Sequence, residues 1–310
     1  MAAEQKDILK QPAPKEPPWR TARRIGIHTS TAGGVETAAE RAYRLGCSCF
    51  QVFSSSPRQW KPYGLAEQQC AVMNRLREQY ELKPLVIHAN YLVNLAAVNE
   101  NFYQKSIAAF RGEVERALAL CAEYLVVHPG SHRGMTREAG LQRAAQAIER
   151  AVEGLGIGES GLTVLIENTA GSEFSLGGTF AQVVELVEGL REHMPVAACI
   201  DTCHTHVAGY DMVSEEGYGT TMEFLDRTIG LENVRVWHCN DAKAARGSKL
   251  DRHQHVGQGT IGLETFRRLL NDPRTAHAAF IAETPIDEPG DDWRNVETLK
   301  RLVKPPGEES

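Results

Sequence analysis

Histidines and carboxylates recur along this chain at the last residue of short apolar runs. Six runs, PLVIH, YLVVH, TVLIE, AACID, VRVWH and FIAE, end at His88, His128, Glu167, Asp201, His238 and Glu283. Carboxylates that share one small site repel each other unless cations neutralise them, because burying uncompensated charge is costly. Imidazole nitrogens favour zinc or a neighbouring transition metal over magnesium and calcium, which prefer all-oxygen sites. The residue types therefore predict a site for zinc or manganese.

Two shorter motifs add candidate ligands beyond the ends of these runs. In CIDTCH, Asp201 and His204 are three residues apart, so a turn after the run can send both side chains toward one cluster. In KLDRHQH, Asp251 and His253 alternate around Arg252, and extended backbone places such alternate residues on one face. Taken alone, the second motif favours a charged, solvated loop. The other candidate ligands favour the metal interpretation.

The apolar runs alternate with longer segments of helical periodicity, such as GVETAAERAYRL and TREAGLQRAAQAIERAVEGL. Two further runs, RIGIH ending at His28 and CFQVF ending at Phe53, bring the candidate strands to eight. Eight strand–helix units around a parallel sheet predict an α/β fold, a single (β/α)8 TIM barrel. In such barrels catalytic groups project from the C-terminal ends of the strands, which is where the histidines and carboxylates lie.

Length and composition agree with one barrel domain. We expect a flexible, proline-rich N-terminal extension over residues 1–23, the barrel over 24–304 and a disordered tail over 305–310. No apolar run is long enough to cross a bilayer and the N-terminus lacks a secretory signal, so a cytoplasmic location is expected. The seven cysteines include no CxxC pair, which argues against a disulfide framework or a thiolate zinc site.

Between Ile25 and Leu302 the chain resembles the endonuclease IV family of abasic-site nucleases. The resemblance rests on nine segments that occur in order: GIHTSTAGG, PRQW, HANYLVNLA, HPGSH, IENTAG, CIDTCHTHVAGYD, HCNDAK, SKLDRHQHVGQGTIG and IAETP. It implies hydrolysis of the phosphodiester bond on the 5′ side of an abasic site in double-stranded DNA, leaving a 3′-hydroxyl and a 5′-deoxyribose phosphate. A monomer is expected, and 3′-repair phosphodiesterase activity is expected by the same chemistry.

The resemblance further implies three zinc ions per chain, with manganese admitted at some sites. The first ion would be bound by His88, His128 and Glu167, the second by Asp201, His238 and Glu283, and the third by His204, Asp251 and His253. Glu167 would bridge the first two ions and orient the nucleophile. This ligand set contains no cysteine, which suits Lewis-acid catalysis with positions left open for water and phosphate.

The net charge of −6 argues against a generally basic nucleic-acid-binding protein. The metals resolve this objection, because the four ligand carboxylates account for −4 and three zinc ions would add +6. A positive mouth can therefore exist on an acidic protein.

Other residues are expected to assist in less direct ways. The resemblance implies that Arg58 and Gln59 of PRQW, together with Tyr91, contact DNA where the abasic sugar leaves the stack. The alternative is a loop that covers the core and exposes its polar groups to solvent. His28 and His132 are expected to hydrogen bond to the ligands.

Two other functions fit part of the pattern. A sugar isomerase or epimerase on the same barrel needs one metal, for which Glu167, Asp201, His238 and Glu283 would suffice. That function leaves the other five candidate ligands unexplained. A zinc-storage or DNA-binding module without enzyme activity is disfavoured, because the implied ligand set leaves coordination positions open.

Overall fold

Eight parallel strands form the central barrel of the computed structural model, which describes residues 7–56, 59–60 and 64–305. Neighbouring strands pair in the order β1-β10-β7-β6-β5-β4-β3-β2. The strands are β1 (Arg24–Ile27), β2 (Phe50–Phe53), β3 (Leu85–His88), β4 (Tyr124–Val127), β5 (Thr163–Glu167), β6 (Val196–Asp201), β7 (Val234–His238) and β10 (Ala279–Ala282). Each ends within one residue of its predicted end, and the predicted TIM barrel is confirmed.

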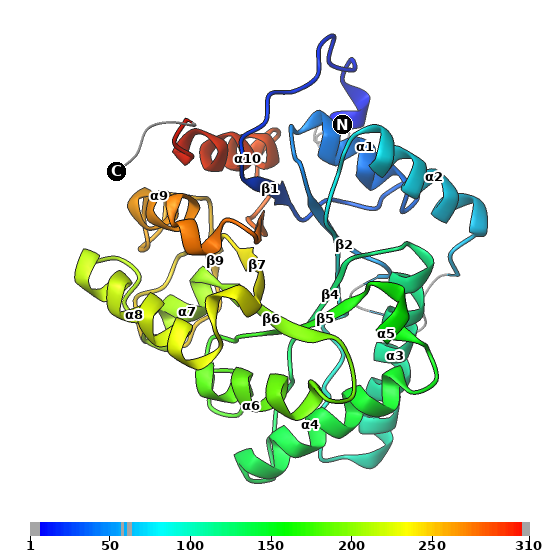
Figure 1. Cartoon of the computed structure of the whole chain (residues 1–310), viewed down its shortest axis with the longest axis vertical. Coiled ribbons are helices and arrows are strands. Elements are labelled where there is room, and N and C mark those ends of the chain that lie inside the picture. Colours follow the sequence, from blue (N-terminus) through cyan, green and yellow to red (C-terminus); the bar gives the residue numbers. More distant parts are fainter. Residues whose placement is uncertain (1–6, 57–58, 61–63, 306–310) are drawn as a thin grey trace.

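Helices follow the strands along the chain and surround the barrel, as Figure 1 shows. They are α1 (Thr37–Arg44), α2 (Glu67–Gln79), α3 (Glu100–Ala119), α4 (Arg137–Val152), α5 (Ile157–Ser160), α6 (Phe180–Leu190), α7 (Thr202–Ala208), α8 (Glu215–Thr228), α9 (Leu263–Asn271) and α10 (Asp291–Leu302), with 3-10 turns η1 (Ile8–Lys10), η2 (Leu231–Asn233) and η3 (Pro273–Thr275). Side-chain caps such as Asn99, Thr136 and Thr179 accept a backbone N–H at the start of α3, α4 and α6. Among the described residues, no helix has both the length and the apolar character needed to cross a membrane.

The connection between β7 and β10 departs from the simple strand–helix repeat. It contains a short antiparallel pair, β8 (Asp241–Ala242) and β9 (His253–Gln254), before α9 begins. The pair carries one of the predicted ligands, His253, on its second strand. The loop from the end of β7 to α9 therefore has its own secondary structure.

Strand residues alternate between the inside of the barrel and the side that faces the helices, because successive side chains of a strand point in opposite directions. Inside the barrel, Val86, Leu165 and Val236 belong to an apolar cluster that is distinct from the larger core between sheet and helices. Two residues further along each of these strands comes a polar residue, His88, Glu167 or His238. The predicted ligands thus occupy the inward positions of the layer above the apolar cluster.

The barrel closes where β1 approaches β2. The backbone N–H of Thr29 donates to the carbonyl of Gln51 at 2.8 Å, just after β1 ends. A Cβ atom added to Gly26 would lie only 2.1 Å from the carbonyl oxygen of Cys49 on the neighbouring segment. Glycine is therefore required at this position for the two segments to come together.

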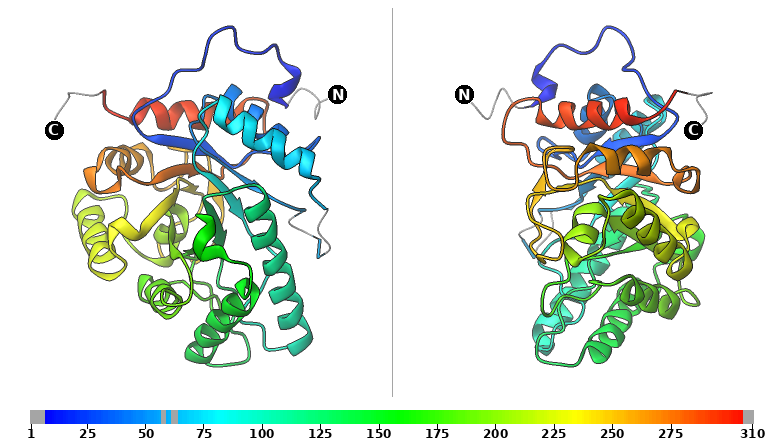
Figure 2. Two further views of the ribbon diagram at one scale, coloured as in Figure 1. Left: turned by 45° about the vertical axis from the view of Figure 1, so that its right-hand side comes forward. Right: turned by 90° about the vertical axis from the view of Figure 1, so that its left-hand side faces the viewer.

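The N-terminal segment runs over the outside of the barrel past α1 and α10 (Figures 1 and 2). The carboxylate of Asp7 pairs with the buried guanidinium of Arg41 at 2.8 Å. The indole N–H of Trp19 donates to Glu297 at 3.1 Å. These contacts tie the described part, residues 7–23, to the barrel at two points. The division into flexible extension, barrel domain and disordered tail stays a prediction.

Gly26→Ala is expected to lower the free energy of unfolding by about 3 kcal/mol, because the methyl group has no space unless the backbone moves. Gly189→Ala is the matched control, since that glycine lies exposed in α6 with no atom within 4 Å of an added Cβ. The control should change stability by no more than about 1 kcal/mol, in the stabilising direction. Urea unfolding of the two variants measures both effects, and a Gly26→Ala chain as stable as the original would contradict this account of barrel closure.

Candidate metal centre

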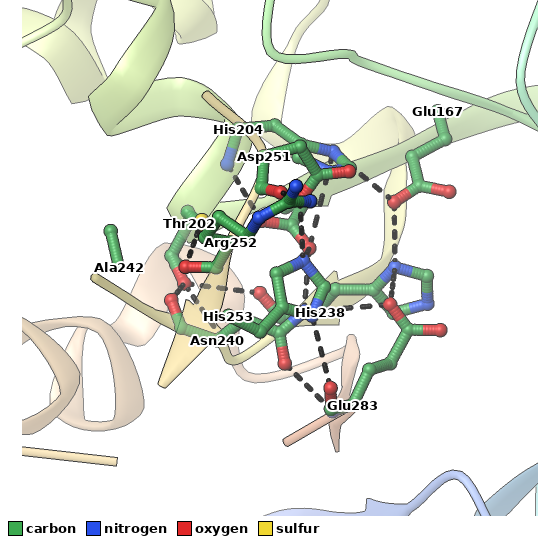
Figure 3. Close-up of polar contacts among 12 residues, drawn as sticks. Glu167, Thr202, His204, His238, Asn240, Ala242, Asp251, Arg252, His253 and Glu283 are labelled. Atoms are coloured by element: carbon green, nitrogen blue, oxygen red, sulfur yellow. Dashed lines mark hydrogen bonds and ion pairs between the residues drawn. The ribbon is translucent and has the colours of Figure 1, made fainter. Parts of the chain in front are cut away.

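All nine predicted ligands lie at the C-terminal end of the barrel, where their donor atoms form overlapping groups. Donor atoms lie within 4.8 Å of one another in the groups His88–His128–Glu167, Glu167–Asp201–His238–Glu283 and Asp201–His204–His253. Asp251 completes the set, because its two carboxylate oxygens each lie 3.2 Å from a histidine nitrogen, in His204 and His253. Figure 3 shows His204, Asp251 and His253 turned toward one another beside Glu167, His238 and Glu283.

Glu167 lies at the centre of this cluster and is completely buried. Its Oε2 atom is 2.8 Å from His128 Nε2 and 3.1 Å from His88 Nε2, whereas its Oε1 atom is 2.8 Å from His238 Nδ1. Burial alone would raise the pKa of Glu167, but the charges of His128 and His238 hold it well below its ordinary value. The two oxygens therefore face two different donor groups, as a bridging carboxylate requires.

The third group combines residues from two separate elements, His204 on α7 and Asp251 and His253 on the β8–β9 loop. Burial lowers the pKa of His204, but the carboxylates of Asp201 and Asp251 raise it to about 10. Burial also lowers the pKa of His253, but the contact with the Asp251 carboxylate outweighs this effect and raises the pKa to about 9. In the metal-free protein, protons on these imidazoles compensate the carboxylates. A divalent cation can take over that role, because it binds the same atoms.

The orientations of the imidazoles fit a bound cation. The Nδ1 atoms of His88, His204 and His253 lie 2.8, 2.9 and 3.0 Å from the backbone carbonyls of Ala89, Asn168 and Glu283. A carbonyl only accepts, so each Nδ1 carries a proton, and loss of the second ring proton leaves the lone pair of Nε2 directed into the cluster. His253 Nε2 is buried without a well-formed hydrogen bond, although Asp251 Oδ1 lies 3.2 Å away. These residues are therefore suited to hold metal ions.

Two buried cysteines lie beside the candidate ligands. The Sγ atom of Cys199 is within 4.8 Å of donor atoms of Glu167 and His238, and that of Cys203 is equally near Asp251 and His253. Burial raises the pKa of Cys199 to about 12 and that of Cys203 further still. Both are therefore neutral thiols. Because a thiol must lose its proton to bind a metal ion, the neighbouring carboxylates and imidazoles are the better ligands.

Sequence reasoning missed three amide side chains that orient the ligands. Gln51 is fully buried, and its Oε1 accepts from His238 Nε2 at 2.8 Å while its Nε2 donates to Glu283. Asn240 donates to Asp201 at 2.6 Å, and Asn168 accepts the backbone N–H of Asp201 at 2.7 Å. Their signals in the sequence are a glutamine inside the apolar run CFQVF and an asparagine one or two residues after a ligand in IEN and HCN.

The two histidines expected to support the ligands lie in different surroundings. His28 Nδ1 is 3.0 Å from Gln51 Nε2 and 3.6 Å from Glu283 Oε1, so it belongs to the network around Glu283. His132 instead donates to the carbonyl of Met135 at 3.0 Å and packs against the ring of Phe174. These contacts stabilise the β4–α4 loop and give His132 no link to the ligands among the described residues.

Two of the three candidates for DNA contact, Tyr91 and Gln59, lie at the rim of the site. Tyr91 is 63% exposed, and its ring packs edge-on against Phe53 at 5.1 Å. Gln59 is exposed, and its carbonyl accepts a hydrogen bond from Asn90 at 2.9 Å. Arg58 lies outside the described residues. A cavity of about 350 Å³, lined in part by Tyr91, opens beside the histidine ligands.

The chain is similar to known proteins over most of its length. A family model described as a xylose isomerase-like TIM barrel matches residues 39–302. A probable endonuclease 4 from Solibacter usitatus is 48% identical over 282 residues, which cover 90% of this chain and 97% of that protein. The crystal structure of endonuclease IV from Thermus thermophilus superimposes with a TM-score of 0.80 at 40% identity, covering 90% of this chain and 98% of that one.

Sugar epimerases share the fold at much lower identity. A D-tagatose 3-epimerase-like protein superimposes with a TM-score of 0.65 at 20% identity, covering 90% of this chain and 96% of that one. At this identity the similarity extends to the barrel alone.

Gln51→Leu is expected to weaken the binding of one zinc equivalent about 10- to 100-fold, because His238 and Glu283 lose the amide that orients them. Competition with a chromophoric chelator measures this affinity. Gln104→Leu, on the exposed face of α3, is the control and should bind zinc as the unaltered chain does. Unchanged zinc affinity in Gln51→Leu would show that Gln51 does not orient the ligands.

Proposed function

The chain belongs to the endonuclease IV family, and from this premise we propose that it hydrolyses the phosphodiester bond on the 5′ side of abasic sites in double-stranded DNA. The products are a 3′-hydroxyl and a 5′-deoxyribose phosphate. Nuclease activity and a part in DNA repair follow from the family. The lesion, the bond that is cut and the number of ions are the content of the proposal.

The observation that carries the proposal is the number of donor residues around Glu167. A one-metal sugar isomerase or epimerase would use only the group of Glu167, Asp201, His238 and Glu283. The remaining five donors, His88, His128, His204, Asp251 and His253, lie in two further groups on either side. Three donor groups, two of which share the Glu167 carboxylate, support three ions rather than one.

Zinc ions held by these groups, with manganese as an alternative at some sites, would supply Lewis-acid stabilisation of phosphate charge and would acidify bound water. Glu167 sets the spacing of the first two groups, because one of its oxygens faces each of them. Its position also allows it to orient the attacking water. Backbone carbonyls hold the rings of His88 and His204 in place, so their Nε2 atoms do not reorganise during the reaction.

Selectivity for abasic sites comes from the cost of extruding a nucleotide from the double helix. A nucleotide without a base has no pairing or stacking to lose, so it enters a site in a barrel mouth at the lowest cost. Tyr91, with its exposed ring beside His88, is placed to fill the space that the lesion leaves. Gln59, and Arg58 next to it in the sequence, are proposed to assist it. The three ions offset the acidic net charge at the place where phosphate binds.

The same chemistry acts on blocked 3′ ends, so 3′-repair phosphodiesterase activity is part of the proposal. A cytoplasmic location and a monomeric enzyme also stay predictions. Neither is needed for the argument from the donor groups.

Glu167→Gln is expected to abolish incision of a duplex with one abasic site, lowering the rate by at least about a thousandfold, because the neutral amide cannot bridge two ions. DNA binding should stay within a few-fold of the original. Gel analysis of a labelled duplex measures incision, and filter binding measures affinity. If the Glu167→Gln chain still cut the duplex, Glu167 would not bridge two ions as proposed.

The wider proposal has its own decisive measurement on the unaltered chain. Metal analysis should find three zinc equivalents per chain, and chelation should abolish incision until zinc is returned. One equivalent per chain, together with an abasic duplex that stays intact with zinc present, would refute the proposed function.

Tyr91→Ala is expected to reduce the preference for abasic over intact duplex about tenfold, because the exposed ring no longer stacks in the gap. Zinc content should not change, since the ring contacts Phe53 and the side of His88 but supplies no ligand atom. Competition binding with the two duplexes measures the preference. Tyr91→Phe should retain it, and an unaltered preference in Tyr91→Ala would exclude Tyr91 from DNA recognition.

A further inference from the structure

Asp241 is a completely buried carboxylate outside the ligand set, and five backbone N–H groups donate to it. Its Oδ1 accepts from Ala242 at 2.8 Å and Ile261 at 2.9 Å. Its Oδ2 accepts from Gly257 and Gly259 at 3.0 Å each and from Gly262 at 3.2 Å. Four of these donors come from one short stretch, residues 257–262. The carboxylate therefore holds that stretch in a loop around itself.

The glycines of the motif VGQGTIG permit this close approach. An added Cβ at Gly259 would lie 2.3 Å from the carbonyl oxygen of Ala242 and 2.4 Å from Oδ1 of Asp241. Gly257 and Gly262 have φ angles of +80° and +78°, which side chains rarely allow. The loop is thus built to bring its N–H groups onto one buried anion.

The same carboxylate lies at the base of the loop that carries two candidate ligands. Asp241 and Ala242 form β8, which pairs with β9 so that Ala242 lies opposite His253. The N–H of Lys243 donates to the carbonyl of Arg252 at 2.9 Å, directly after Asp251. The N–H of Thr260 donates to the carbonyl of Ala242 at 2.8 Å. Both ends of the segment that carries Asp251 and His253 are therefore attached to the backbone beside Asp241.

We infer that Asp241 is a positioning residue for the third donor group, which it holds in place before any ion is bound. His204 lies on α7, whereas Asp251 and His253 lie on this loop, which is also attached to α7 because the N–H of Lys249 donates to the carbonyl of Val207 at 2.9 Å. The five donors on Asp241 order part of the loop in advance, so binding of an ion has less conformational entropy to offset and the affinity rises. The inference rests on the proposed function in assuming that this group binds zinc.

Asp241→Asn is expected to weaken the binding of one zinc equivalent roughly 10- to 100-fold, because an amide cannot accept hydrogen bonds through its nitrogen. The zinc equivalent affected should be the one that His253→Ala also removes. The other two equivalents should bind as tightly as they do in the unaltered chain. Zinc release to excess chelator, followed with a chromophoric indicator, measures each equivalent. Asp272→Asn is the control, because that carboxylate also accepts a backbone N–H, from Arg274 at 2.9 Å. Asp272 lies before the start of β10, whereas the candidate ligands lie at the other end of the strands.

Gly259→Ala should disrupt the same contact, because the added methyl group would collide with the Asp241 carboxylate. We expect this variant to lose the same zinc equivalent. Saturating zinc should restore the incision rate of both variants, which a general loss of folding would not allow. Unchanged zinc release in both variants, or parallel loss of all three equivalents, would overturn the inference.

Hydrogen exchange on the unaltered chain tests the inference even if both variants fail to fold. After zinc removal, the amides of residues 257–262 should keep their protection, because Asp241 rather than the ion holds them. Loss of that protection would overturn the inference. An intact abasic duplex with three zinc equivalents bound would instead refute the proposed function and leave the role of Asp241 standing.

Discussion

The structure depends on one electrostatic constraint, the burial of several carboxylates and imidazoles in one small volume at the barrel mouth. Glu167, Asp201 and His238 are fully buried, and their donor atoms lie within 4.8 Å of one another together with Glu283. Such a set is costly unless every charge has a partner. In the metal-free protein, raised histidine pKa values provide part of the compensation, since protonated rings pair with the carboxylates. The arrangement makes chemical sense as a set of ligands in which cations replace those protons.

The barrel provides this concentration of ligands through the period of its strands. Each strand turns every second side chain inward, so one layer of the interior can be apolar while the layer above it is polar. Val86 below His88 on β3 and Leu165 below Glu167 on β5 show the two layers on strands that β4 separates. The apolar layer excludes water beneath the site, and this strengthens the ligand interactions above it.

The strand pattern and the clustering of the candidate ligands could be predicted from the sequence because both depend on local periodicity and residue type. The supporting residues could not, because their roles depend on partners distant in the sequence. Gln51 contacts His238, 187 positions away, and a single glutamine in an apolar strand does not reveal that partner. Asp241 stands next to a ligand motif and resembles a ligand in sequence, yet its oxygens face backbone N–H groups. His132 shows the reverse case, since its motif suggests the site and its contacts belong to a neighbouring loop.

The candidate ligands include two sets, those at the ends of barrel strands and those on the loop between β7 and β10. Glu167, Asp201, His238 and Glu283 lie at or just after strand ends, where the barrel geometry alone brings them together. The epimerase-like neighbour at 20% identity shares the barrel alone. Asp251 and His253 come instead from an insertion between β7 and β10 that has its own pairing and its own buried carboxylate. A loop can change without disturbing the barrel, so a further donor group can be added at the barrel mouth where the loop is held rigidly enough to present Asp251 and His253.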